Sequence, residues 1–273
     1  QAANLKKEYK LMVADADGHN EKEILKSSDP IISPAWSGDG KWLAYVSFEN
    51  VGGTTRSRIF IQNVVTGKRA RLANKQLAKF QGINGAPAWS PDDKYIAMTL
   101  SRGRNSDIYL MNMASKALRQ VTEHYAMDTE PAWSPDGRHL VFTSDRAGRP
   151  QIYRVPVSGG RAERLNIEGK ENARASYDPS GKHLTLVTNQ GEGKGHQIGV
   201  FSLANGSLEI LTDGRLDESP TFAPNGAMIL FAAQRGGRGL LSAVSADGRV
   251  RQELRSHSAM VRSPAWSPLN LDR

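Results

Sequence analysis

The residues best able to carry out chemistry in this sequence are six histidines and a few carboxylates. The histidines show neither H-E-x-x-H nor a comparable ligand spacing, so no metal site is predicted from them. They are His19, His124, His139, His183, His196 and His257. Two acidic pairs, Asp128 with Glu130 and Asp217 with Glu218, could hold an ion or act as an acid/base pair. Their positions in the repeat described below favour salt bridges to a bound partner instead.

Three further motifs bear on whether the sequence contains a chemical site. The stretch DADG, residues 15–18, is similar to part of a calcium loop, but Val13 would occupy the first ligand position, so a hairpin turn is favoured. The stretch GEGKG, residues 191–195, lacks the spacing and the following Ser or Thr of a phosphate-binding loop. No G-x-S-x-G nucleophile motif occurs. We therefore predict no catalytic residues, no metal and no cofactor.

Composition limits the class of protein. The chain is 38% hydrophobic and 23% charged over 273 residues, which is typical of a globular domain. A net charge of +8 permits an acidic partner, but no Lys/Arg run is long enough for a nucleic-acid tail, and a solubilising surface is favoured. The chain contains no cysteine and so uses neither disulfides nor thiolate chemistry.

One unit recurs along the whole chain. Its signature is Pro-Ala-Trp-Ser-Pro-Asp-Gly, with two degenerate copies, and its aromatic residue falls at Trp36, Trp89, Trp133, Tyr177, Phe222 and Trp266. The spacings are 53, 44, 44, 45 and 44 residues. A period in the low forties with four strand-like segments per unit is typical of a β-propeller. The sequence therefore predicts an all-β, six-bladed propeller, with the tryptophans packing between blades.

Each unit divides into four expected strands, A to D. In the third unit these are residues 130–134, 138–144, 151–157 and 161–165, with Pro156 ending strand C. The other expected B strands are 42–47, 95–100, 183–188 and 228–233, and the other C strands are 58–63, 107–113 and 197–203.

The last blade is expected to use both chain ends. Strand A would follow Ser263, and residues 8–15 and 23–25 would supply strands C and D. Closing the ring in this way avoids a long open edge. Its B strand is expected before Gln1, so we interpret residues 1–273 as a single propeller domain cut from a longer protein.

The strand order places function on one face. The A–B and C–D turns, such as Asp39-Gly40 and Asp136-Gly137, are tight and structural. The B–C and D–A connections share the opposite face and are expected to be long, irregular loops. The B–C loops would form an outer rim of basic residues, namely Arg56, Arg58, Arg102, Arg104, Arg146, Arg149, Lys194, Arg235 and Arg238.

The 53-residue spacing locates two insertions on that face. About four extra residues precede Ile59, and five more lie between Leu72 and Trp89. Inside the rim, the segments leading into each aromatic signature would line the mouth of the central channel. The predicted partner-binding residues are Ile32, Ser33, Asn84, Gly85, Ala86, Asp128, Thr129, Glu130, Arg174, Asp217, Glu218, Ser219, Arg262 and Ser263.

The repeats also resemble a known family. The S/E-P-A-W-S-P-D-G units, NGAPAWSPDDK, FTSDRAGRPQIYRV and LDESPTFAPNG are similar to the propeller domain of the TolB family. The resemblance extends from about Glu8 to Pro268, and the order of the degenerate units is its most specific part.

The resemblance implies a six-bladed propeller preceded by an α/β domain that this chain lacks. It implies a non-enzymatic, monomeric component of the Tol–Pal system in the periplasm, serving outer-membrane integrity and cell division. The propeller mouth would dock the peptidoglycan-associated lipoprotein Pal, which makes the protein peripheral to the outer membrane. An upstream segment would contact TolA, and some bacteriocins would imitate Pal.

Family contact positions correspond to Asn84, Gly85, Ala86, Thr129 and Glu130. The chain departs from relatives in two places. Ile83 replaces a histidine found in some of them, and the segment 172–174 replaces a more acidic stretch. Choice of partner is the property that these departures would affect.

Two other functions are consistent with the residues alone. A propeller lyase or hydrolase would use the same channel and would need a metal or a convergent acid/base set. A nucleic-acid binder would use the arginine rim and would bind with a steep dependence on salt. The family resemblance favours neither, and no nucleic-acid partner is expected.

Overall fold

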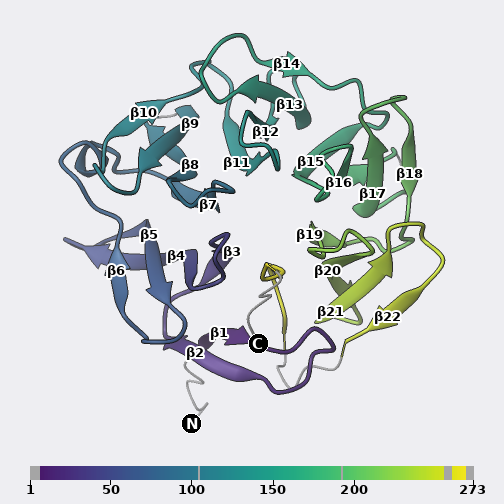
Figure 1. Ribbon diagram of the computed structural model, residues 1–273, viewed down its shortest axis with the longest axis horizontal. Coiled ribbons are helices and arrows are strands. Elements are labelled where there is room, and N and C mark those ends of the chain that lie inside the picture. The colour runs from purple at the N-terminus through teal and green to yellow at the C-terminus, as the bar shows by residue number, and fades with distance from the viewer. Residues whose placement is uncertain (1–6, 104, 192, 255–259, 269–273) are drawn as a thin grey trace.

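The computed structural model describes residues 7–103, 105–191, 193–254 and 260–268. Five four-stranded antiparallel sheets and one two-stranded sheet follow one another around a ring (Figure 1). In each four-stranded sheet the first strand lies nearest the centre and the fourth lies at the periphery. This is the blade arrangement of a β-propeller, and the predicted fold class is confirmed.

The strands follow the repeat closely. The two-stranded sheet pairs β1 (Tyr9–Val13) with β2 (Lys22–Ser27). Blade 1 contains β3 (Ile32–Trp36), β4 (Trp42–Val51), β5 (Thr54–Asn63) and β6 (Arg69–Arg71). A short 3-10 helix, η1 (Leu77–Lys79), then leads to blade 2, which contains β7 (Asn84–Trp89), β8 (Tyr95–Arg102), β9 (Asn105–Asn112) and β10 (Leu118–Gln120).

The remaining blades repeat the same order. Blade 3 contains β11 (Asp128–Trp133), β12 (His139–Ser144), β13 (Gln151–Pro156) and β14 (Glu163–Arg164). Blade 4 contains β15 (Glu171–Tyr177), β16 (His183–Asn189), β17 (Gln197–Ser202) and β18 (Leu208–Ile210). Blade 5 contains β19 (Glu218–Phe222), β20 (Met228–Arg235), β21 (Arg238–Ser245) and β22 (Arg251–Glu253).

The predicted number of six blades is wrong. The described residues form five, and the sector between blades 5 and 1 holds only the β1–β2 sheet (Figure 1). The predicted inner strand of that sector, the segment 263–268, has no strand structure. A strand is defined by its hydrogen-bonded neighbour, and no described residue pairs with this segment.

The B and C strands were predicted well because their side chains alternate or run continuously apolar. In β12, five of the six residues are buried, as expected for a strand covered by a neighbouring blade on each face. Strand β13 ends at Pro156, as predicted from the missing proline N–H.

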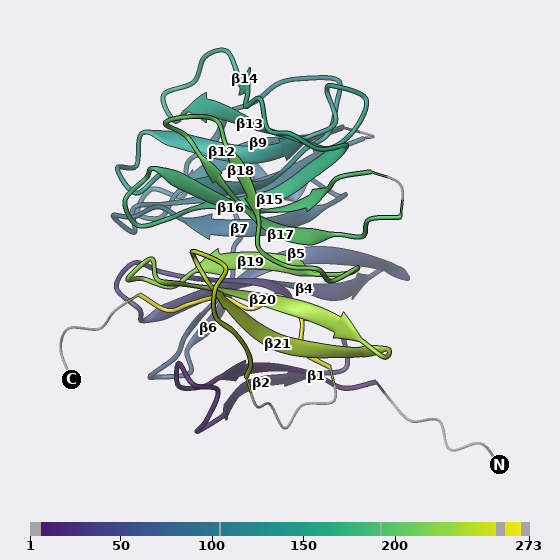
Figure 2. The ribbon, with the colours of Figure 1, turned by 90° about the vertical axis from the view of Figure 1, so that its right-hand side faces the viewer.

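Two of the B–C connections differ from the expected irregular loops, whereas those between β12 and β13 and between β16 and β17 are longer. Strands β4 and β5 continue to a tight turn at Gly52-Gly53, and β20 and β21 to one at Gly236-Gly237. Both glycines of each turn have positive φ, which matches the twist of a two-residue hairpin. These hairpins project on the same side of the ring (Figure 2). The shared face was therefore predicted correctly, but its regularity was not.

The hydrophobic core is divided among the contacts between consecutive blades. One cluster joins Ala97 and Leu110 of blade 2 to Leu140 and Phe142 of blade 3, and Trp133 packs against it. The Trp133 Nε1–H also donates to the carbonyl oxygen of Ala88 in the preceding blade at 3.0 Å. The predicted role of the tryptophan in blade packing is confirmed at this position.

The tight-turn face carries a matched pair of exceptions to the repeat. Asp93 stands where other units have the turn glycine, and it keeps the left-handed conformation with φ 58°. Gly38 stands where other units have proline, so it presents an extra N–H. The Asp93 carboxylate accepts hydrogen bonds from the N–H groups of Gly38 at 2.5 Å and Asp39 at 2.9 Å. The aspartate of blade 2 therefore satisfies the donors that blade 1 exposes.

Replacing Trp133 tests the packing between blades. We expect Trp133→Ala to lower the free energy of unfolding by about 3 kcal/mol, because a large side chain leaves the core. Trp133→Phe should cost about 1 kcal/mol, mainly through loss of the hydrogen bond to Ala88. Urea denaturation measures both, and a near-neutral Trp133→Ala would show that the core lies elsewhere.

Candidate functional site at the channel mouth

A left-handed bulge recurs at the start of every inner strand. The residue before Pro-Ala, or its equivalent, has φ between 46° and 57° in each of six units. These residues are Ser33, Ala86, Glu130, Arg174, Ser219 and Ser263. In all five complete blades the strand register shifts at this point, with two residues of the inner strand opposite one residue of its partner. A bulge of this kind bends the strand and re-aims a side chain.

The bulge also links neighbouring blades. The N–H of Glu130 donates to Thr99 Oγ1 of blade 2 at 3.2 Å, and that of Arg174 donates to Thr143 Oγ1 of blade 3 at 2.9 Å. A left-handed residue other than glycine costs on the order of 1 kcal/mol. At Glu130 and Arg174 the hydrogen bonds to the preceding blade offset that cost and hold the bulge in place.

Arg174 connects three blades across the mouth. Its Nε lies 2.8 Å from Glu130 Oε1, and its Nη1 lies 3.4 Å from Glu218 Oε2 and 3.1 Å from Ser219 Oγ. Glu130 Oε2 in turn accepts from the Thr143 hydroxyl at 2.9 Å. The three charged side chains remain 30–42% exposed. Ion pairs this exposed stabilise a fold little, so their main effect is to fix the charges at the mouth.

Three predicted contact residues with polar side chains are buried instead. Asn84 is 6% exposed, Asp128 0% and Asp217 2%. All three lie two residues before a bulge. Asn84 Nδ2 donates to the carbonyl oxygen of Ser57 at 3.2 Å, and burial raises the pKa of Asp217. The Asn84 bond joins blade 2 to blade 1.

Arg146, predicted in the outer rim, is also internal. Its Nη2 lies 2.5 Å from Asp128 Oδ2, and its side chain is only 15% exposed. The guanidinium lies over the rings of Phe142 and Tyr153, 5.6 and 5.4 Å from their centroids. Other rim residues, including Arg102, Arg149 and Lys194, are exposed, and Arg104 is outside the described residues.

The remaining predicted residues vary in exposure. Ile32 is 37% exposed, and Arg262 is also exposed. Gly85 is buried, and the half-buried members are Ser33, Ala86, Thr129 and Ser263. The exposed and half-buried members of the predicted set therefore belong to the bulges and the residues beside them.

Sequence reasoning missed a set of exposed apolar side chains. Four of them lie three residues before a bulge, namely Ile83 (54% exposed), Met127 (48%), Leu216 (50%) and Met260 (51%). Tyr125, at 86%, lies close to Met127 in the chain. Aligning the repeats on the bulge position would have revealed this pattern. We call these five residues the apolar ring.

Within the described ranges, no group of three or more His, Cys, Asp or Glu side chains could hold a metal ion. In the same part of the chain, no helix has the length and apolar character needed to span a bilayer.

The sequence matches a known domain family. The model described as the TolB beta propeller domain matches residues 1–270. The chain belongs to the TolB propeller family. TolB of Alcanivorax borkumensis, a Tol-Pal system protein, is 58% identical over 95% of this chain. The Ruthia magnifica TolB is 54% identical over 96% of it. The chain spans 58% and 59% of the length of these two relatives.

Solved structures agree with the family assignment. The crystal structure of TolB from Acinetobacter baumannii is 41% identical, covers 95% of this chain and 63% of its own, and superposes with a TM-score of 0.86. An oligogalacturonate lyase in complex with manganese, 18% identical over 86% of this chain and 71% of its own, gives a TM-score of 0.59. That second similarity shows only that the fold is shared.

Asp107 provides a pH test of the buried polar layer beneath the mouth. Burial, with smaller contributions from the nearby Asp128 and Glu123 carboxylates, raises the pKa of this carboxyl to about 6. Between pH 4 and pH 6 the carboxyl of Asp107 is ionised in the unfolded chain but still protonated in the folded protein. The free energy of unfolding therefore falls as the pH rises through this range. Asp107→Asn cannot ionise, so its unfolding free energy relative to wild type should increase by about 1–2 kcal/mol between pH 4 and pH 7.

Urea denaturation at several pH values measures this difference. The exposed Asp29 provides the matched control, because Asp29→Asn should show no comparable trend. A constant difference between wild type and Asp107→Asn would contradict the burial argument.

Proposed function

We propose that this chain is the protein-binding propeller of a Tol–Pal component and that its mouth docks the lipoprotein Pal. The observation that carries the proposal is the Arg174 network, which presents charges from three blades, with Met127 and Leu216 of the apolar ring within three residues of its members along the chain. Clustered apolar side chains supply association energy when water is excluded, and fixed charges select the partner. Membership of the TolB family, whose relatives are named as Tol-Pal system proteins, supports the choice of Pal as the partner.

A hollow beside the network would receive a partner side chain. It has a volume of about 250 Å³ and is lined in part by Pro150, Val187, His196, Arg174 and Glu218. Apolar walls with a charged edge suit an anchor residue that carries a polar tip. A partner loop entering the mouth would place such an anchor there.

The mouth would bind as a preformed surface. The bulges are tied to adjacent blades by Thr99 and Thr143, and the Arg174 side chain is held by three partners. Little ordering would therefore be needed on binding, which favours affinity.

The wider role follows the family. We propose a non-enzymatic, monomeric protein of the periplasm that supports outer-membrane integrity and cell division through Pal. In the whole protein, a separate upstream α/β domain would precede this propeller domain, and an upstream segment would contact TolA. Bacteriocins that imitate Pal would use the same mouth.

Reversing the charge of Glu130 tests the docking site. Glu130→Lys breaks the ion pair to Arg174 and places two cations together, so we expect at least about a tenfold loss of affinity for Pal of the same organism. The thermal midpoint should change little because the pair is exposed. Calorimetric titration with purified Pal gives the affinity.

Two further variants complete the experiment. Leu216→Asp should weaken binding by placing a charge in the apolar ring. Glu209→Lys makes the same charge change as Glu130→Lys on the peripheral strand β18 and should leave affinity unchanged. Equal affinity of wild type and both mouth variants would refute docking at the mouth.

A further inference from the structure

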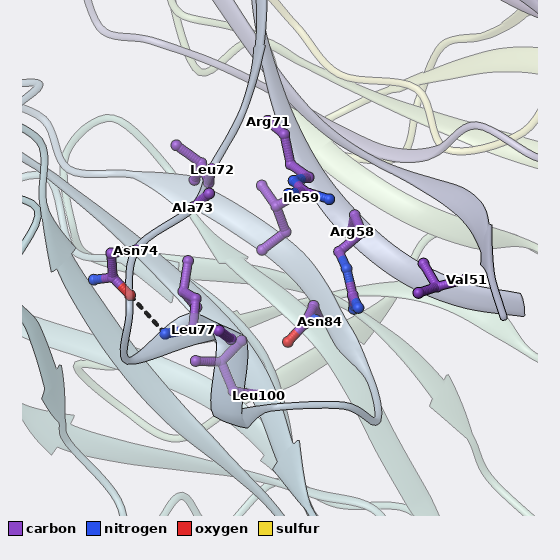
Figure 3. A pocket seen from close by; sticks show the side chains of 11 residues that line it. Val51, Arg58, Ile59, Arg71, Leu72, Ala73, Asn74, Leu77, Asn84 and Leu100 are labelled. Carbon is purple, nitrogen blue, oxygen red and sulfur yellow. Dashed lines mark hydrogen bonds between the residues drawn. The ribbon is translucent and has the colours of Figure 1, made fainter. Parts of the chain in front are cut away.

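A pocket lies between blades 1 and 2, away from the Arg174 network. It has a volume of about 210 Å³ (Figure 3). The two insertions predicted from the 53-residue spacing build its walls. Val51 comes from the extended β4–β5 hairpin, and Ala73, Asn74, Leu77 and Ala78 come from the segment that contains η1.

One side of the pocket is strongly basic. Arg58 and Arg71 line it, and Arg56 lies two residues before Arg58 on β5. Burial, together with the nearby Arg56 guanidinium, lowers the pKa of Arg58. Glu49 pairs with Arg71 at 2.9 Å. Three guanidinium groups therefore share one identified carboxylate, which leaves local positive charge for an anion.

Asn84 forms the second polar feature. It is 6% exposed, and its Nδ2 donates to the carbonyl oxygens of Ser57 at 3.2 Å and Phe80 at 3.4 Å. These bonds fix which end of the amide carries the oxygen. Oδ1 is buried and accepts no hydrogen bond from any described residue. In Figure 3 this oxygen points away from Arg58, toward the side of the pocket that holds Leu77 and Leu100. A buried acceptor without a donor is costly, so it would favour a ligand that carries an N–H.

The corresponding site between blades 3 and 4 is closed differently. Asn172 occupies the place of Asn84, and its Nδ2 donates to Oε1 of Gln151 at 3.1 Å. By register with the B strands, Gln151 occupies the place of Arg58. Asn172 Oδ1 also lacks a described donor, but the residue beside it is neutral. At the junction of blades 1 and 2 the same acceptor lies beside a guanidinium-lined pocket instead.

We propose that this pocket binds the α-carboxylate of an N-acylated amino acid with a branched aliphatic side chain, free or at the C-terminus of a peptide. The carboxylate would contact Arg58 and Arg71, and the adjacent amide N–H would donate to Asn84 Oδ1. The aliphatic group would pack against Ile59, Leu72, Leu77 and Leu100, which form the apolar wall (Figure 3). The volume is below the ~300 Å³ of typical drug-sized sites, which suits a single residue.

Calorimetric titration with N-acetyl-L-leucine tests the proposal. We expect a Kd of about 1 mM or lower, typical of a well-placed small ligand. N-acetyl-L-leucinamide lacks the carboxylate, and 4-methylpentanoate lacks the N–H. Each should bind roughly tenfold more weakly or worse. An acetylated tetrapeptide ending in leucine distinguishes the two sources, because it binds only if the pocket admits a longer chain.

Two variants assign binding to the pocket. Arg58→Gln removes one guanidinium and should weaken N-acetyl-L-leucine by about tenfold or more. Ala78→Phe fills the pocket from exposed η1 without altering the charged groups and should abolish binding. Arg154→Gln, on strand C of blade 3, is the matched control and should have no effect.

These measurements test ligand binding in this pocket and not the function proposed for the mouth. No binding of N-acetyl-L-leucine to the wild type, or binding unaffected by Ala78→Phe in a folded protein, overturns the proposal. Equal binding of N-acetyl-L-leucinamide would also overturn it, because the guanidinium groups would then have no role. None of these results depends on Pal binding at the mouth.

Discussion

The left-handed residue at the start of each inner strand is the constraint on which the rest of the molecule depends. It inserts one extra residue into the strand and bends the chain toward the channel. The bend turns its N–H toward the preceding blade, where Thr99 and Thr143 accept it. The same bend turns its side chain toward the mouth. One backbone conformation therefore both joins the blades and creates the surface for recognition.

The residue types at the bulges support this view. Glycine would adopt a positive φ without strain, yet the six positions hold serine, alanine, glutamate and arginine. At Glu130 and Arg174 the retained side chains form the link across blades. Backbone strain at a site that presents charged groups is consistent with selection for the side chain rather than for the unstrained backbone that glycine would give.

Much of the fold could be predicted from the sequence because the repeat is periodic and its strands are apolar. Side-chain exposure could not, because it depends on the preceding blade. Asp128 was predicted at the surface, but Arg146 folds back to cover it. Met127, one residue earlier, was overlooked and is exposed. The count of complete blades failed because the segment 263–268 has no pairing strand among the described residues.

The exchange of glycine and aspartate on the tight-turn face has a consequence for how the ring can diversify. Gly38 and Asp93 depart from the repeat together, and each departure is satisfied by the other across a single junction. Two residues that meet at one junction between blades can therefore change together, while the residues at the other junctions stay the same. Such a modular ring can acquire a new feature at one junction without rebuilding the others.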